Sequence, residues 1–357
     1  MEKITYLVRW GKNKETAWSG TNYSLFKALS KYYQVDDVNL KFPKVISVLM
    51  HRLLRLDWFA GGYYELQYFR RKYKGVKGKV LQMSGIVDAS PATQSYIYND
   101  LSVSYVEYMR EHLPKVFAVS DFQNANLSLL HKQAMAQARF YDKCTGIFCM
   151  GHWLRKFLIE SGLPESKVIY SGGGTNVNFS LINPQKKTNN KILFVGKDFR
   201  RKGGHITYEA FQLLRQWGEN VELYVAGPLN DPIENPVEGY HFMGQVNFEA
   251  VADLFNKCDI FCMPSYFEAY GLVFVEALTF GLPCIGRDCY EMPYFIDERK
   301  TGLLLREDDP QQLADLMKKI LSDSLYKENV AKKHDYYVQE YSWDAVAKRM
   351  KTAMDRK

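Results

Sequence analysis

The feature that most constrains the fold is a repeated alternation between short apolar runs and longer stretches with helical periodicity. In the first half of the chain the apolar runs are residues 4–10, 80–83, 96–98, 116–119, 146–150 and 167–170. Helical patterns separate several of them, most clearly over residues 22–32, 122–142 and 152–161. Short buried strands joined by helices are typical of a parallel sheet with helices on both faces. The alternation therefore predicts an α/β chain with mostly parallel, doubly wound sheets.

The length of the chain and one glycine-rich stretch predict two domains. With 357 residues, of which 46% are hydrophobic and 24% charged, the chain is long enough for two globular cores and is not typical of disorder. Residues 171–190 contain three consecutive glycines and many asparagines, as linkers and hinges do. We expect the following division: a first domain over residues 1–172, a linker over 173–190, a second domain over 191–324 and a charged helical segment over 325–357.

Two glutamates stand eight positions apart in the second half, on either side of a turn. Glu268 precedes the turn at Tyr270 and Gly271, and Glu276 lies in the apolar helix that follows. The first N–H groups of that helix, at Gly271 and Leu272, have no partner within the helix and favour an anion. Acids beside an anion-binding helix start suit a ligand with both hydroxyls and phosphate, such as a nucleotide sugar.

A glycine-rich basic loop lies upstream of these acids. The apolar run 191–195 leads directly into Gly196 and Lys197, and then into Arg200-Arg201-Lys202-Gly203-Gly204. Glycine lets the backbone approach a ligand closely, while lysine and arginine donate charge-assisted hydrogen bonds to phosphate. The alternative for Arg200 is a solvated turn, since it belongs to a run of charges.

Together these motifs resemble the retaining glycosyltransferases of family 4. That family has the pattern Gly-[Arg/Lys]-x4-Lys-Gly followed by Glu-x7-Glu, and residues 196–203 and 268–276 match both parts in order. The resemblance is dense over residues 190–305 and thinner before them. It implies the GT-B fold, in which two Rossmann-like domains face each other across a donor cleft. The first domain would lie on the acceptor side, the second would bind the nucleotide sugar, and the C-terminal helical segment would pack back on the first domain.

The resemblance also implies a role for individual residues. Glu268 would contact hydroxyls of the donor sugar, with a first-turn helix acid as the alternative, and Glu276 would accept from the ribose, with an exposed acid as the alternative. Arg201 and Lys202 would bind the diphosphate and stabilise its charge as the sugar leaves. The remaining donor-binding candidates are Gly20, Thr21, Gly196, Lys197, Met243, Val246, Tyr270, Gly271 and Leu272.

One departure from the family concerns the acceptor side. Relatives often have a histidine at the end of a strand in the first domain, whereas residues 96–101 of this chain contain none. Asp100 is the catalytic candidate that takes its place, and His152 is the alternative. The missing histidine keeps two other functions open: a catalytically silent nucleotide-sugar-binding subunit, and an epimerase or hydrolase of similar shape.

No metal cofactor is expected. The chain has no Asp-x-Asp sequence, so the cationic side chains are expected to neutralise the diphosphate in place of a divalent ion. Two cysteine pairs, Cys258 with Cys262 and Cys284 with Cys289, lack the usual zinc spacing, and reduced buried thiols are the expected alternative.

The positive charge of the chain is concentrated in residues 41–79. This segment has a net charge of +8, against +7 for the whole chain. Its basic residues are Lys41, Lys44, Arg52, Arg55, Arg70, Arg71, Lys72, Lys74, Lys77 and Lys79. Aromatic and aliphatic residues between them suit docking on anionic lipid, and a solvated face over core aromatics is the alternative. No nucleic-acid recognition module accompanies the charge. With no signal peptide and no apolar run of about 20 residues, we expect a cytoplasmic protein, peripheral on the inner face of the membrane.

Overall fold

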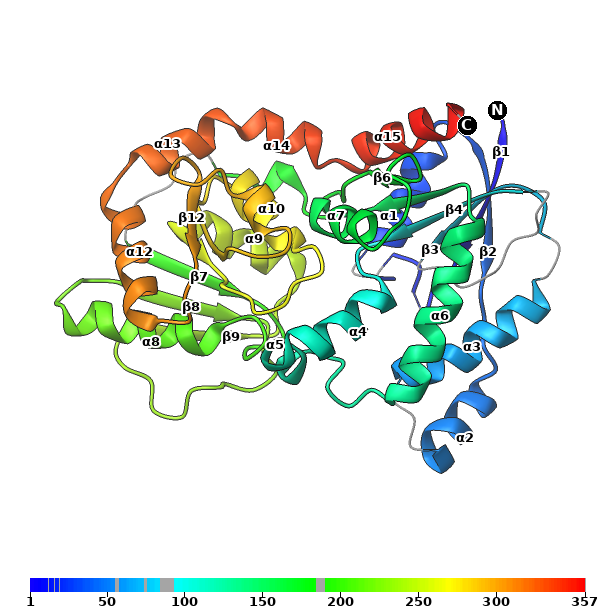
Figure 1. The fold of residues 1–357 in the computed structure, drawn as a ribbon. Helices are drawn as coiled ribbons and strands as arrows, with labels where there is room; N and C mark the ends of the chain where they lie inside the picture. Colours follow the sequence, from blue (N-terminus) through cyan, green and yellow to red (C-terminus); the bar gives the residue numbers. More distant parts are fainter. Residues whose placement is uncertain are drawn as a thin grey trace. The chain divides into compact units, whose positions relative to one another are not determined.

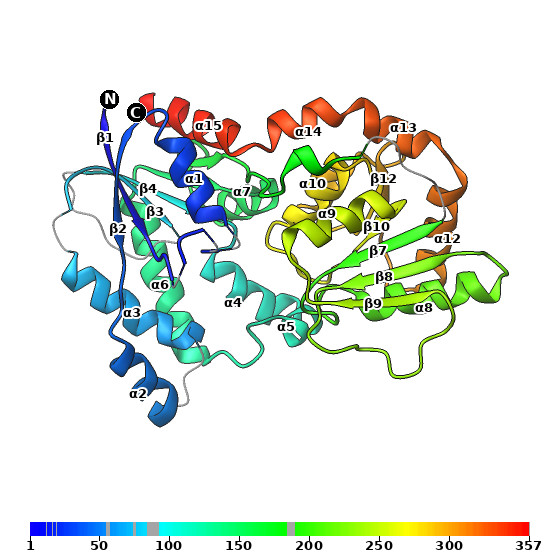
Figure 2. The ribbon, with the colours of Figure 1, turned by 180° about the vertical axis from the view of Figure 1, so that it is seen from behind.

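The computed structural model divides the chain into two compact units (Figures 1 and 2). The first unit comprises residues 1–176 and 342–357, and the second comprises residues 177–341. The structure describes all residues except 12, 16, 19, 55–57, 74–75, 84–92, 184–189 and 357, and it describes only the backbone of residues 50–54, 58–62 and 93. Residues 184–189 of the expected linker therefore lie outside the described part.

The first unit is built on a six-stranded parallel sheet in the order β2-β1-β3-β4-β5-β6 among the described residues. Its strands are β1 (Lys3–Val8), β2 (Gln34–Asn39), β3 (Gly78–Met83), β4 (Thr93–Asn99), β5 (Gly146–Cys149) and β6 (Val168–Tyr170). Its helices are α1 (Thr21–Leu29), α2 (Lys44–Leu54), α3 (Trp58–Lys72), α4 (Val103–His112), α5 (Pro114–Val119), α6 (Leu127–Lys143), α7 (His152–Glu160) and α15 (Trp343–Asp355).

Burial explains most of these elements, and the exceptions are local. The central strands place Tyr6, Tyr96 and Phe148 fully inside the core, as the apolar runs predict. The prediction of a strand over residues 116–119 is wrong. These residues belong to helix α5, which starts with Pro114 and buries none of its side chains. A proline at the first position of a helix already has the required φ, and its missing N–H is not needed there.

The second unit holds a similar sheet, in the order β12-β11-β10-β7-β8-β9 among the described residues. Its strands are β7 (Lys191–Val195), β8 (Glu222–Ala226), β9 (Tyr240–Gly244), β10 (Ile260–Cys262), β11 (Cys284–Arg287) and β12 (Gly302–Leu305), all parallel. Its helices are the short 3-10 turn η1 (Phe179–Leu181), α8 (Gly204–Gln216), α9 (Phe248–Lys257), α10 (Leu272–Thr279), α11 (Met292–Phe295), α12 (Pro310–Ser322), α13 (Leu325–Lys332) and α14 (His334–Glu340).

The order of strands in the second sheet fixes where a ligand is best held. From β7 the chain proceeds outward to β8 and β9, and then returns to place β10 on the other side of β7. Loops leaving the carboxyl ends of β7 and β10 therefore run in opposite directions. This place, where the strand order reverses, is the switch point of the sheet, and open α/β sheets bind ligands there.

The C-terminal helices divide between the units. Helices α13 and α14 belong to the second unit, whereas α15 belongs to the first, where it packs on α1 and Lys31 pairs with Asp344 at 2.6 Å. Among the residues that the structure describes, no helix has the length and apolar character needed to cross a bilayer.

Candidate functional site

The candidate site lies where the loops after β7 and β10 meet, at the switch point of the second sheet. The loop after β7 carries Arg201 and Lys202, and the loop after β10 carries Glu268. Gly203, with φ of 76°, lets these loops approach, because a Cβ there would lie 2.5 Å from the carbonyl oxygen of Pro264. The two sequence motifs, more than sixty residues apart, are thus brought together in one place.

Lys202 and Glu268 form the centre of this site. The Lys202 Nζ donates to Glu268 Oε2 at 2.6 Å, and both side chains are largely buried, with exposed fractions of 15% and 14%. The aliphatic part of Lys202 passes directly over Gly196, where a Cβ would lie 2.3 Å from Lys202 Cδ. Gly196 therefore leaves the space that the lysine needs to reach the acid.

Arg201 fixes the neighbouring backbone. Its Nη1 donates to the carbonyl oxygen of Phe267 at 2.7 Å, and its Nε lies 3.2 Å from Asp198 Oδ2. The same Nη1 is 3.9 Å from Glu268 Oε2. Two cations and two carboxylates, those of Asp198 and Glu268, thus gather at the ends of two adjacent strands.

Helix α10 starts directly beside this cluster. Its N-cap is Gly271, with φ of 94° and no side-chain cap. Leu272 and Glu276 lie one turn apart on the half-exposed face of the helix, while Phe274 and Val275 are fully buried. The Tyr270 side chain is buried against Phe295, with ring centroids 5.0 Å apart, so a ligand at this turn would meet the backbone of Tyr270 rather than its ring.

Three other predicted donor-binding residues lie after β7, in β9 and after β9. Lys197 is exposed in the loop after β7. Met243 lies in β9 with 40% of its surface exposed, and Val246 follows that strand, just before α9. The structure brings none of these three into the cluster of Lys202 and Glu268 by a hydrogen bond or ion pair among the described residues.

The remaining predicted residues lie in the first unit. Gly20 is the N-cap of α1, and Thr21 is the buried first residue of that helix. Asp100 follows β4 and is half-buried. Burial raises the pKa of Tyr98, and the charge of Asp100 raises it further. His152, the alternative to Asp100, begins α7 and stacks on Tyr170 at 3.7 Å between ring centroids.

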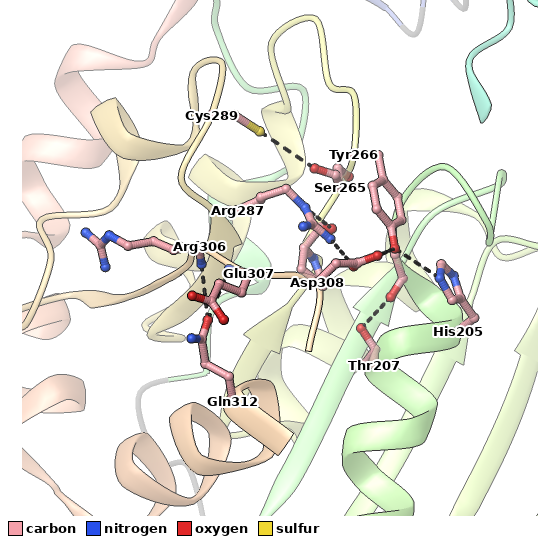
Figure 3. A network of polar contacts seen from close by, with 12 residues as sticks. His205, Thr207, Ser265, Tyr266, Arg287, Cys289, Arg306, Glu307, Asp308 and Gln312 are labelled. Atoms are coloured by element: carbon pink, nitrogen blue, oxygen red, sulfur yellow. Dashed lines mark hydrogen bonds and ion pairs between the residues drawn. The ribbon is translucent and has the colours of Figure 1, made fainter. Parts of the chain in front are cut away.

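A polar network that the sequence did not indicate holds the other side of the Glu268 loop (Figure 3). The Tyr266 hydroxyl donates to the two carboxylate oxygens of Asp308, at 2.6 and 2.7 Å. Its oxygen accepts from His205 Nε2 at 3.1 Å. The Arg287 guanidinium lies 4.2 Å from the Tyr266 ring centroid and pairs with Asp308 at 3.0 Å. Arg287 Nε also donates to the carbonyl oxygen of Pro264 at 3.3 Å.

The electrostatics of this network favour one set of protonation states. Burial and the hydrogen bond to Asp308 raise the pKa of Tyr266, which keeps its hydroxyl a donor. Partial burial opposes ionisation of Asp308, but the hydrogen bonds from Tyr266 and Arg287 prevail and lower its pKa below 3.8. Burial lowers the pKa of His205 below 6.5, against the raising effect of nearby acids. At neutral pH the network is thus a neutral tyrosine and histidine beside an arginine–carboxylate pair.

The network and the cation cluster hold opposite sides of one loop. Tyr266 N donates to the carbonyl oxygen of Arg201 at 2.9 Å, which links the two groups through the backbone. Arg287 ends β11 and Asp308 follows β12, and these strands come next to β10 in the order β10-β11-β12. Strand order could have indicated that these loops meet, but no spacing in the sequence specifies which side chains pair.

No metal-binding cluster is found in the described part of the chain. Groups of three or more histidine, cysteine, aspartate or glutamate side chains with suitable placement are absent among those residues. The six cysteines are free thiols, of which Cys289 alone is only half-buried.

Comparisons with known proteins match the second unit to a family. Residues 179–341 match the family described as glycosyl transferases group 1. A phosphatidyl-myo-inositol mannosyltransferase from Mycobacterium leprae is 25% identical over 58% of this chain and 58% of its own. A D-inositol 3-phosphate glycosyltransferase from Corynebacterium urealyticum is 29% identical over 44% of this chain and 41% of its own. The matches therefore span about half the length of these curated relatives.

Solved structures resemble the whole chain. A sucrose-phosphate synthase from Thermosynechococcus elongatus has a TM-score of 0.69 at 18% identity, covering 100% of this chain and 99% of its own. Anabaena HepE, solved in complex with UDP and glucose, has a TM-score of 0.65 at 12% identity and covers 100% of both chains. These similarities establish the fold, and the expectation of GT-B architecture is confirmed. Residues 179–341 thus match the glycosyl transferases group 1 family, and the chain has the GT-B fold.

Proposed function

We propose that the protein is a retaining glycosyltransferase that moves a sugar from a nucleotide diphosphate sugar to an acceptor hydroxyl without a metal ion. The observation that carries this proposal is the contact between Lys202 and Glu268 at the switch point of the second sheet. It combines a cation for the diphosphate with a carboxylate for sugar hydroxyls in the position where α/β sheets hold nucleotides.

The proposed chemistry follows from where charge develops. When the bond between the sugar and the diphosphate breaks, negative charge grows on the leaving phosphate. Lys202, Arg201 and the N-terminus of α10 would stabilise that charge, each well-placed donor contributing on the order of 3 kcal/mol. The acceptor hydroxyl would attack from the face that the phosphate leaves, and the phosphate oxygen would take its proton. The sugar would then keep its anomeric configuration.

Glu268 would change partners during donor binding. The diphosphate would compete with the Glu268 carboxylate for Lys202, because both are anions within reach of one ammonium group. Once released from the lysine, the carboxylate would accept hydrogen bonds from sugar hydroxyls. Glu276, half-buried one turn into α10, would accept from the ribose.

The named relatives suggest the kind of acceptor to test. The Mycobacterium leprae protein is by name a mannosyltransferase acting on phosphatidyl-myo-inositol, which is a lipid. We therefore propose an acceptor in glycolipid or surface polysaccharide assembly. The free thiols suit the reducing cytoplasm, where we propose that the protein acts.

A nucleotide screen tests the donor site first. The melting temperature would be measured with UDP, GDP, ADP, CMP and dTDP, with and without magnesium, on the wild type and on Lys202→Gln. A nucleotide at 100 times its dissociation constant stabilises by about 2.7 kcal/mol. A metal-independent shift for one nucleotide, lost in Lys202→Gln, would support the proposal, and the absence of any shift would contradict it.

Turnover separates transfer from the alternatives. The matching nucleotide sugar would be incubated with candidate lipid acceptors, and the anomeric configuration of the product read by NMR. An inverted product would refute retention, and binding without turnover of any nucleotide sugar would favour a silent subunit.

A further inference from the structure

Helix α2 exposes apolar side chains over its first half. Val45 has 80% of its surface exposed, Val48 56%, Leu49 55% and Ile46 43%. Positions 45, 48 and 49 are neighbours at helical spacings of three and four, so these side chains form one continuous surface. We call this set of four residues the α2 face.

The α2 face is flanked by positive charge. Lys41, just before helix α2, and Lys44, the first residue of the helix, are both exposed. Arg71, Lys72 and Lys77 are also exposed in the same segment of sequence. Acids are scarce in the segment: Glu65 pairs with Arg9, and Asp57 lies outside the described residues.

Other aromatic residues of the segment pack into the core of the first unit. Phe42 lies edge-on to Tyr68 at 5.2 Å between ring centroids, and it packs with Phe69 against a core that includes Leu7 and Val80. Lys79, counted with the basic surface from the sequence, is buried and pairs with Glu2 at 2.8 Å, so it does not belong to that surface. Arg55 and Lys74 lie outside the described residues, as does the side chain of Arg52.

We propose that the α2 face docks on an anionic lipid surface, with its aliphatic side chains entering the interface and Lys41 and Lys44 lying against the headgroups. An apolar helix face with lysines beside it matches both parts of such a surface, whereas a neutral protein partner would leave the lysines unmatched. Figures 1 and 2 show α2 at the periphery of the first unit, beyond α3.

Vesicle binding of the full chain tests this proposal. Sedimentation with vesicles of phosphatidylcholine mixed equally with phosphatidylglycerol is compared with phosphatidylcholine alone, at low and high salt. We expect binding that needs the anionic lipid and weakens with salt. The variant Val45→Ser/Val48→Ser/Leu49→Ser should bind at least about tenfold more weakly, since it loses three aliphatic groups from the interface.

Matched variants separate a local surface from general effects. Leu229→Ser removes a leucine that is 74% exposed in the second unit, and it should bind like the wild type. Lys41→Gln/Lys44→Gln should weaken binding by about fivefold for each lysine. Lys156→Gln/Lys300→Gln removes the same charge from two other lysines, each 67% exposed, and should have a much smaller effect.

Three results would overturn the proposal. The first is no vesicle binding by the wild type at low salt, and the second is equal loss of binding in the α2 and control variants. The third is a wild type that sediments as a dimer and does not bind vesicles, together with a triple serine variant that sediments as a monomer. That result would assign the α2 face to a second copy of the chain. The melting temperature of the triple variant verifies that it folds, and the lysine variants test the proposal if it does not.

Discussion

Breaking the contact between Lys202 and Glu268 gives the sharpest test of the candidate site. Over 2.6 Å and at an effective dielectric constant of about 20, the gross attraction of the two charges is about 6 kcal/mol. Removing both ions from water costs several kcal/mol for each, so most of this attraction is offset. We expect Lys202→Gln to lower the free energy of unfolding by about 2 kcal/mol, because Glu268 stays largely buried after losing its ion-pair partner. Arg201 would remain 3.9 Å from the carboxylate.

Thermal unfolding measures that loss. For a unit of this size, about 2 kcal/mol corresponds to a fall in melting temperature of roughly 4 to 8 °C. The double variant Lys202→Gln/Glu268→Gln should recover part of the fall, since no unpaired buried charge remains. Lys300→Gln is the control, because Lys300 is 67% exposed and pairs with Asp297 at 3.5 Å, and exposed pairs contribute little.

The outcome that refutes the reasoning is specific. If Lys202→Gln melts with the wild type and the losses of the two single variants simply add in the double variant, the pair has no coupling energy. The site would then be two independent polar residues. If Lys202→Gln is destabilised but binds nucleotide as well as the wild type does, the pair is structural, and the diphosphate is bound elsewhere.

Further predictions concern the acid, the network and the metal. Glu268→Gln should lower turnover by about a hundredfold to a thousandfold while nucleoside diphosphate binds at least as tightly, because a competing anion is removed; weaker binding by calorimetry would contradict this exchange of partners. Tyr266→Phe loses the hydrogen bond to Asp308 and should raise the donor KM. An unchanged KM would show that the network does not position Glu268. Because the pKa of Asp308 is below 3.8 in the folded chain, its stabilisation is present above that pH and lost as pH falls further; the melting temperatures of wild type and Asp308→Asn should therefore converge in strong acid, and a constant difference would be evidence against the shift. Sugar transfer should survive EDTA, and its loss on chelation with recovery on adding magnesium would refute the metal-independent mechanism.

Much of the fold follows from the sequence because parallel strands are buried on both faces. The runs 80–83, 96–98 and 146–150 lie in β3, β4 and β5, where nearly every side chain is buried. Strand β2 was not predicted because its sequence, Gln34–Asn39, is mostly polar. It lies at the edge of the sheet, where it pairs only with β1 among the described residues. The error at residues 116–119 shows that an apolar run of that length fits either element, and Pro114 was the signal for a helix.

The site was predictable to the extent that its residues follow the same two strands. The spacing of Gly196, Lys202 and Glu268 led to the expectation of a donor site, and the structure brings these three into contact. The network of Tyr266, Arg287 and Asp308 depends on the ends of three strands and on side-chain directions at each. Those directions are set by tertiary packing, and no local pattern in the sequence records them.

The arrangement around the Glu268 loop separates three roles that one variant alone would confuse. Lys202 attracts both the carboxylate and the proposed diphosphate, so its loss should weaken nucleotide binding, whereas the loss of charge on Glu268 should not. Tyr266 touches neither, since its hydroxyl is directed to Asp308 and His205, and its loss should act only through the position of the loop. Opposite effects on nucleotide affinity from Lys202→Gln and Glu268→Gln, with donor KM raised in Tyr266→Phe, would therefore be explained by competition between two anions for one ammonium group. Parallel effects in all three variants would instead be explained by a loop that merely unfolds.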